Sequence, residues 1–154
     1  MLDICPVIKK NFMRLEVKMV SLFFFGMLSL NAQQQSEMFN VTVNISNFKN
    51  NKGFALVAIC NTKESFLGAG IKAAKTKITN NVCSVTFKDL PKGMYAISMF
   101  HDENDNNKLD TNFLGIPKES YGCSNNAKGF FGPPKWEHAK FEIRNKDITQ
   151  HIQI

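Results

Sequence analysis

The amino-acid sequence predicts an all-β protein, a sandwich or barrel of about seven short strands. Apolar and polar residues alternate in several short segments, as they do in strands that bury one face. Turns rich in Asn, Gly and Pro separate these segments at short intervals. The chain contains no convincing helical pattern. These observations together favour a β-sandwich or β-barrel over an α/β or helical fold.

The start of the chain has the order of a secretory signal peptide. Four basic residues precede the apolar run 20–30, and the small residue Ala32 follows it. A membrane-spanning helix needs about 20 apolar residues, so this run is too short to span. We therefore expect residues 1–32 to be a signal peptide, residues 33–38 a flexible start and residues 39–154 the β domain. The product would be exported, as a periplasmic, cell-surface or secreted protein.

The first expected strands differ in how they are buried. Residues 39–46 alternate strictly, which indicates a half-buried strand. Residues 54–60 are apolar on both faces, which is typical of a central strand. In residues 74–78, the side chains Ala74, Thr76 and Ile78 alternate with Lys75 and Lys77. This pattern is typical of an edge strand whose lysines discourage pairing with a further strand.

Turn residues mark the remaining strands. Asn80 and Asn81 form an expected tight turn before a strand at 83–87. Pro91 and Gly93 form the next turn, because proline fixes φ and glycine frees it. The remaining expected elements, in chain order, are a strand at 94–100, a loop from 102 to about 137, and strands at 138–143 and 148–154.

Three cysteines remain after the expected signal peptide. Cys60 and Cys83 lie in strand-like segments, where cysteine usually acts as a small buried apolar residue. A disulfide between them is the alternative in an oxidising compartment. No cysteine or histidine group has the spacing of a zinc site.

An acidic loop, residues 101–110, stands out in a chain whose formal net charge is +6. Alternate oxygen-bearing side chains in a turning loop can converge on Ca²⁺, which accepts six to eight oxygens. Phe113 stands where such loops usually supply a bidentate glutamate, and Glu119 substitutes if the loop folds back. A solvated Asn/Asp turn is the alternative, and Mg²⁺ fits less well. The expected metal ligands are Asp102, Asn104, Asn106, Lys108 (through its carbonyl), Asp110 and Glu119.

A loop rich in glycine and aromatic residues, 113–136, follows the acidic loop. It is too long and too apolar to be a simple tether. Two interpretations stay open: a platform that binds carbohydrate or peptide, and a small satellite core that holds the loop down. The candidate ligand-binding residues are Tyr121, Phe130, Phe131 and Trp136.

Composition and motifs argue against several function classes. The chain has no run of five like charges, so nothing supports a nucleic-acid partner. It also lacks a Gly-x-Ser-x-Gly elbow, a phosphate-binding loop and a His-Glu-x-x-His helix. Cys123 with His101 or His138 would resemble a catalytic Cys/His pair, but a lone loop thiol is usually inert. We therefore expect no enzyme.

Several motifs resemble those of a bacterial exported family, domain of unknown function 2141. They are Phe87-x-x-Leu90-Pro91-x-Gly93-x-Tyr95-Ala96, His101-Asp102-Glu103-Asn104, the run from Lys108 to Glu119, Tyr121-Gly122-x-Ser124-Asn125-Asn126-Ala127 and Phe131-Gly132-Pro133-Pro134. The likeness covers about residues 40–154. The Leu-Pro-x-Gly-x-Tyr turn is also similar to turns in transthyretin-like and carboxypeptidase-regulatory domains. The resemblance implies a single immunoglobulin-like or prealbumin-like antiparallel sandwich, and no established activity. Asn107 stands where the family would have glycine.

The resulting expectation is a non-catalytic exported module that binds calcium. The ion would order the adjoining loop, which would then bind a glycan, a peptide or an envelope protein. A carrier of a small apolar ligand inside the sandwich is the alternative, and a hydrolase is the third hypothesis. Neither a nucleic-acid partner nor a membrane span after signal removal is expected.

Overall fold

A computed structural model describes residues 37–130 and 132–154 of the chain. The expected signal peptide and residues 33–36 of the expected flexible start lie outside these residues. The elements are β1 (Met38–Ser46), β2 (Phe54–Cys60), β3 (Lys72–Lys77), β4 (Val82–Pro91), β5 (Gly93–Asp102), β6 (Tyr121–Cys123), the 3-10 turn η1 (Ser124–Asn126), α2 (Trp136–Ala139), β7 (Phe141–Ile143) and β8 (Ile148–Gln153). The all-β prediction is confirmed. Among the described residues, no helix has the length and apolar character needed to cross a membrane.

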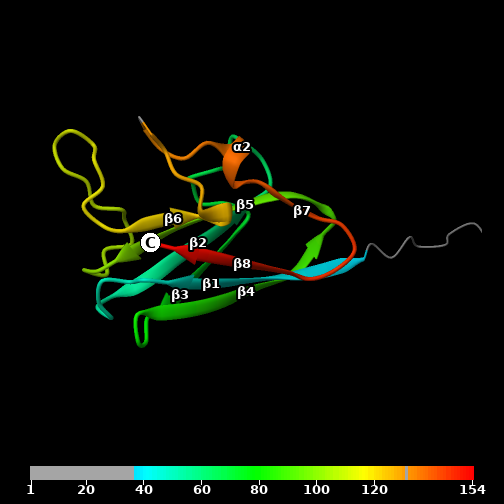
Figure 1. Ribbon diagram of the computed structural model, residues 1–154, viewed down its shortest axis with the longest axis horizontal. Coiled ribbons are helices and arrows are strands. Elements are labelled where there is room, and N and C mark those ends of the chain that lie inside the picture. The colour runs from blue at the N-terminus through cyan, green and yellow to red at the C-terminus, as the bar shows by residue number, and fades with distance from the viewer. Residues whose placement is uncertain (1–36, 131) are drawn as a thin grey trace, which may run out of the picture. The chain divides into compact units, whose positions relative to one another are not determined.

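The strands form two sheets (Figure 1). One has the order β4-β1-β8 and the other the order β3-β2-β5-β6, with β7 also paired to β5. The prediction of a wholly antiparallel arrangement is wrong, because β1 and β8 run parallel, with Val41 opposite Ile148. Parallel neighbours require a long connection. Here β1 and β8 are the first and last strands, and the second sheet is built by the chain between them.

Two elements depart from the expected strands. His138 lies in α2, so only Phe141–Ile143 of the expected strand 138–143 is extended. The helical turn places Trp136 and Ala139 three residues apart on one buried face, which explains why helix replaces strand there. The short strand β6 lies inside the expected loop and pairs with β5.

One apolar core joins the two sheets. Alternate residues of each strand enter it, as the period of two requires. Val43 of β1, Val57 of β2 and Ile97 of β5 are each at most 1 % exposed in this core. A second, smaller cluster lies on the other face of β2 and β5. It consists of Cys60, Ala96, Cys123, Trp136 and Ala139.

The turns follow the residues that the sequence provides. Asn80 and Asn81 both adopt left-handed φ angles, 53° and 61°, as expected for a tight turn. Pro91 ends β4 and Gly93, with φ 156°, begins β5. The buried Tyr95 hydroxyl donates a hydrogen bond of 2.9 Å to the Pro91 carbonyl, which holds this turn against the core.

The three described cysteines are free and buried. Cys83 belongs to the core between the sheets, whereas Cys60 belongs to the cluster on the far face of β2. The expectation of small buried apolar residues is confirmed. The alternative, a disulfide between Cys60 and Cys83, is not formed, because Cys83 of β4 lies in the core between the sheets and Cys60 of β2 points to the outer face of the second sheet.

Candidate functional site

The acidic loop leaves the sheet at the end of β5 and returns at β6. Asp102, the last residue of β5, is fully buried. Its carboxylate accepts two backbone hydrogen bonds, from Asn106 N–H at 3.0 Å and from Asn107 N–H at 2.8 Å. The side chain therefore bends the following residues back around itself.

Two asparagines continue this pattern along the loop. The Asn104 Oδ1 accepts the Asn106 N–H at 3.2 Å, and the Asn106 Oδ1 accepts the Lys108 N–H at 2.8 Å. Asp105 and Asn107 adopt left-handed φ angles of 61° and 60°. Asparagine tolerates this conformation better than most residues. The chain thus coils with alternate residues bonded to its own backbone.

Asp110 and Glu119 close the loop. The Asp110 carboxylate accepts the side-chain amides of Asn104 at 2.8 Å and Asn106 at 3.0 Å. The Glu119 side chain, 8 % exposed, accepts the Glu103 N–H at 3.0 Å and the Asp110 N–H at 2.9 Å. Glu119 therefore holds both ends of the loop, and the chain folds back to bring it there.

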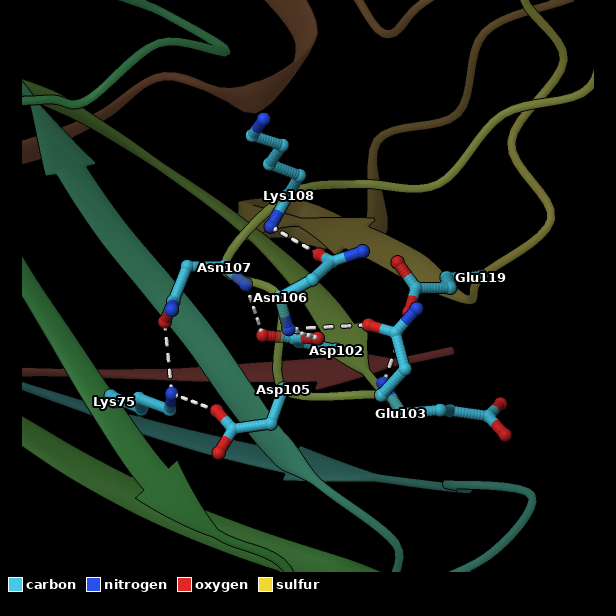
Figure 2. Close-up of polar contacts among 9 residues, drawn as sticks. Lys75, Asp102, Glu103, Asp105, Asn106, Asn107, Lys108 and Glu119 are labelled. Atoms are coloured by element: carbon cyan, nitrogen blue, oxygen red, sulfur yellow. Dashed lines mark hydrogen bonds and ion pairs between the residues drawn. The ribbon is translucent and has the colours of Figure 1, made fainter.

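The two other carboxylates of the loop, those of Asp105 and Glu103, point in different directions (Figure 2). Asp105 pairs with the Lys75 ammonium group, which also donates to the Asn107 Oδ1 at 2.9 Å. The Glu103 Oε2 accepts the Asn50 side-chain amide at 3.1 Å. Asp105 and Glu103 thus attach the loop to β3 and to the turn before β2.

A hard cation in this loop would need carboxylate, amide and backbone carbonyl oxygens together. Within residues 37–130 and 132–154, no three His, Cys, Asp or Glu side chains stand close enough to hold a metal by themselves. Asn104 Oδ1, Asn106 Oδ1 and the Lys108 carbonyl would complete the set around Asp102, Asp110 and Glu119. A carbonyl or carboxylate oxygen has two lone pairs, so each oxygen bonded once to an N–H can still bind an ion. The donor set fits Ca²⁺, which takes neutral oxygens and carboxylates together.

His101 lies beside the loop on the opposite face of β5. It is fully buried, and its ring packs edge-on to Phe48 with centroids 5.2 Å apart. The Nε2 lies 2.7 Å from the Lys52 carbonyl, so Nε2 carries the proton and donates it. The Nδ1 has no hydrogen-bond partner among the described residues and lies 3.8 Å from Glu103 Oε1. His101 thus fixes the strand end from which the loop starts.

The described residues of the predicted aromatic platform divide between two places: Tyr121 and Phe130 line one hollow, whereas Trp136 lies in the smaller buried cluster. Trp136 is 9 % exposed and packs edge-on to Phe66, with ring centroids 5.9 Å apart. Tyr121 and Phe130 are 41 % and 92 % exposed. Phe131 lies outside the described residues. Trp136 therefore belongs to the satellite cluster that was the alternative, and Tyr121 and Phe130 remain predicted ligand-binding residues.

The Cys123 thiol does not form a Cys/His pair with His101. Cys123 is 1 % exposed in the cluster under α2, whereas His101 faces the core between the sheets. Burial raises the pKa of Cys123 to about 12. The thiol stays protonated at neutral pH, and a protonated thiol is a poor nucleophile.

Sequence reasoning missed the residues that fix the second loop. The buried Ser124 Oγ accepts the Ile97 N–H at 2.9 Å and donates to the Ala139 carbonyl at 2.6 Å. The Asn125 side-chain amide donates to the Lys140 carbonyl at 2.9 Å. These bonds tie η1 to β5 and to α2.

A hollow on the outer face of the second sheet was also missed. It measures about 1150 Å³ and is lined by Leu56, Ala58, Phe100, Lys108 and other residues of the adjoining loops. The signal was present in the sequence, because residues 54–60 are apolar on both faces. We interpreted that pattern only as a central strand.

A family model described as "Uncharacterized protein conserved in bacteria (DUF2141)" matches residues 43–151. This match agrees with the resemblance carried by the sequence motifs. The matched range contains the acidic loop, η1 and α2. No curated protein and no solved structure matches the chain.

Proposed function

Because the chain belongs to the DUF2141 family of bacterial proteins, whose description assigns no activity, we propose a function from the site itself: a non-catalytic exported module that binds Ca²⁺. The ligands are Asp102, Asn104, Asn106, the Lys108 carbonyl, Asp110 and Glu119. Within this proposal the two sheets form an immunoglobulin-like or transthyretin-like sandwich. The shared core and the turn held by Tyr95 support that arrangement.

The observation that carries the proposal is the backbone bonding of the acidic loop. Asp102, Asn104 and Asn106 each accept an N–H from a residue two to five positions ahead. This bonding fixes the side-chain oxygens of alternate residues against the backbone of the loop. Glu119 then reaches across to the loop from the following segment. A solvated turn does not need a buried glutamate to close it.

Calcium would act by ordering the segments that follow the loop. The Asp110 carbonyl accepts the Lys118 N–H at 2.8 Å, so the ion would also hold the base of the hairpin at 111–117. Tyr121 begins β6 immediately after Glu119 and Ser120. The ordered end would then bind a glycan, a peptide or an envelope protein, with Tyr121 and Phe130 among its contacts.

The hollow favours a second candidate function, the carrier of a small apolar ligand. The space between the sheets is occupied by the core, so a ligand would have to lie on the outer face of the second sheet. A carrier and a calcium module are compatible, because residues 107–109 follow Asp102 and line the hollow.

Thermal unfolding of the full chain, first freed of metal with a chelator, tests the calcium proposal. Exported calcium modules bind with Kd values of about 10⁻⁴–10⁻³ M. Calcium at 10 mM should then stabilise the fold by about 1.4–2.7 kcal/mol and raise Tm by several degrees. Magnesium at the same concentration should raise Tm less.

Paired variants make this test specific. The double variant Asp102→Asn, Asp110→Asn should lose the calcium-dependent rise in Tm. The control Glu103→Gln, Asp105→Asn removes the same charge from carboxylates that point to other partners, and should keep the rise. An unchanged Tm in the wild-type protein, or an equal loss in both double variants, would contradict the proposal.

A further inference from the structure

The outer face of the second sheet is unusually apolar for a face that does not enter the core. Antiparallel sheets commonly present polar side chains on such a face. Leu56 and Phe100 oppose each other across β2 and β5, and Tyr121 continues this row on β6. Leu56 and Phe100 are only half-buried and Tyr121 is 41 % exposed. An exposed apolar row of this kind calls for an occupant.

A shallow trough of small residues runs beside this row. Ala58 lies opposite Ala73 on β3 and opposite Ser98 on β5. Neighbouring strands are about 4.8 Å apart, so three small side chains in line make a trough about 10 Å across. The trough is the floor of the hollow of about 1150 Å³. Its volume is slightly above the range of sites that hold small organic ligands, about 300–1,000 Å³.

The walls of the hollow are apolar as well. Leu67, on one side, is 45 % exposed. Leu114 and Ile116, from the hairpin after the acidic loop, are 68 % and 56 % exposed. The cluster containing Trp136 covers the next row of the sheet, formed by Cys60 and Ala96. The open part of the outer face is thus bounded by that cluster and by the acidic loop.

The charged residues of the lining share one sign. Lys75 and Lys108 are the charged side chains among the described residues that line the hollow, and no carboxylate joins them. Lys75 is already engaged, because it pairs with Asp105 and lies 4.6 Å from the Phe54 ring centroid. The Lys108 ammonium group has no partner within the described part of the chain. Figure 2 shows its side chain pointing away from Asp102 and Asp105.

From this geometry we infer that the hollow binds a single-chain amphiphile with an acidic head group, such as a long-chain carboxylate. The apolar chain lies along the Ala73–Ala58–Ser98 trough, between the Leu56–Phe100 row and the loop walls. The head group lies at the Lys108 ammonium group. Burial of apolar surface supplies most of the affinity, at about 25 cal/mol per Å², and the lysine selects the acidic head. The inference names the ligand class of the carrier, the second candidate function given above, and therefore rests on that candidate.

A free amphiphile suits the hollow better than a bilayer does. Loop residues 67–69, 107–109 and 114–117 line the hollow together with the trough. A membrane surface would meet the loop tips, where Phe113 is 94 % exposed, before it reached Ala58. The floor offers Ser98 as its polar side chain, so a peptide would find few partners for its backbone there.

Isothermal calorimetry of the full chain with palmitate, below its micelle concentration, tests the inference. We expect binding of one palmitate, and at least tenfold weaker binding of hexadecanol, which has no acidic head. Ala73→Phe should weaken palmitate binding at least tenfold, because the phenyl group enters the trough from an exposed edge-strand position. Lys108→Glu should weaken palmitate binding by about tenfold, or about 1.4 kcal/mol, without weakening hexadecanol binding.

Two controls match these variants. Val82→Phe places the same phenyl group on an exposed position of the other sheet, and Lys118→Glu reverses a charge outside the lining. Each should change palmitate affinity less than twofold. Absence of palmitate binding, equal losses in the controls, or binding to anionic phospholipid vesicles without binding to palmitate would overturn the inference.

Measurements with and without calcium distinguish a failure of this inference from a failure of the calcium proposal. Palmitate binding is measured with calcium and with chelator, beside the calcium-dependent Tm. Calcium binding without palmitate binding would refute the inference alone. Palmitate binding without any calcium-dependent rise in Tm would refute the calcium proposal alone.

Discussion

The two faces of β5 differ sharply although they belong to one strand. Tyr95, Ile97 and Met99 point inward and are at most 3 % exposed in the core between the sheets. On the outer face Ser98 and Phe100 are half-buried over the hollow, and Asp102 starts the acidic loop. One face of the strand therefore packs in the core, and the other face carries residues of the proposed binding sites. Because successive side chains alternate, a substitution on one face should leave the other face largely unchanged.

Truncating one residue from each face should give the largest contrast in stability. Ile97→Ala opens a cavity in the closed core and should lower the free energy of unfolding by about 2–5 kcal/mol. Phe100→Ala removes a half-buried ring beside the hollow and should cost less, about 1–2 kcal/mol. Urea unfolding measures both values. A larger loss for Phe100→Ala would break the distinction between the two faces.

The attachment of η1 to β5 and α2 depends on the buried hydroxyl of Ser124. Ser124→Ala leaves the Ile97 N–H and the Ala139 carbonyl without their buried partner, and should cost about 1–3 kcal/mol. Ser84→Ala is the matched control, because its Oγ makes an exposed bond of 2.8 Å to Asn44 Oδ1. The control should change the free energy of unfolding by less than about 0.5 kcal/mol. Equal effects in urea unfolding would show that η1 does not depend on Ser124.

Alkaline pH should weaken the cluster on the outer face. Burial raises the pKa of Cys123 to about 12 and that of Cys60 to about 11. Unfolded thiols ionise near 8.5–9, so above that pH the unfolded state loses protons that the folded state keeps. Stability therefore falls as pH rises from about 9 to 12, by about 1.4 kcal/mol for each pKa unit of difference.

The Cys123→Ala variant isolates this contribution. It should be less stable than the wild type at pH 7.5, because it leaves a small cavity. At pH 10.5 the difference in free energy of unfolding between the two proteins should be about 2 kcal/mol smaller, because the wild-type thiol ionises in the unfolded state and stays protonated in the folded state. Urea unfolding at both pH values measures the difference, and an unchanged difference would show that the thiol ionises normally in the fold.

The smallest expected effect concerns the backbone of the acidic loop. Asn107 has φ 60°, a conformation that costs an ordinary residue about 1–2 kcal/mol. Asn107→Ala and Asn107→Gly both lose the bond from Lys75, so their difference reports the backbone alone. The glycine variant should be about 1 kcal/mol more stable than the alanine variant in thermal unfolding. Equal stabilities would mean that the loop does not hold this residue in the left-handed region.

The comparison of faces also explains how much of the fold the sequence predicts. The expected strands at 39–46, 54–60 and 94–100 coincide with β1, β2 and β5 to within a few residues, because each strand is rich in apolar residues and buries one face in the core. Sequence reasoning missed β6, which has only three residues, and it missed the parallel pairing of β1 with β8. Pairing between distant strands leaves no local pattern in either strand. The helical turn α2 was missed for the same reason, since its burial depends on a cluster from four segments.

The candidate site was predicted in part. The alternate spacing from Asp102 to Asp110 indicated a coiled loop, and Glu119 was expected there only if the chain folded back. The side-chain bonds of Glu119 depend on the position of β6, which the spacing does not contain. The hollow was missed because its floor and walls come from strands and loops far apart in the sequence.

Calorimetric titration of the metal-free full chain with Ca²⁺ tests the central claim most directly, because it measures binding without depending on stability. We expect one site with a Kd of about 10⁻⁴–10⁻³ M, the range of exported calcium modules. Asp102→Asn should abolish this binding, whereas Asp105→Asn should preserve it within a few fold. No heat of binding up to 10 mM Ca²⁺, or equal affinity in the wild-type protein and Asp102→Asn, would contradict the account.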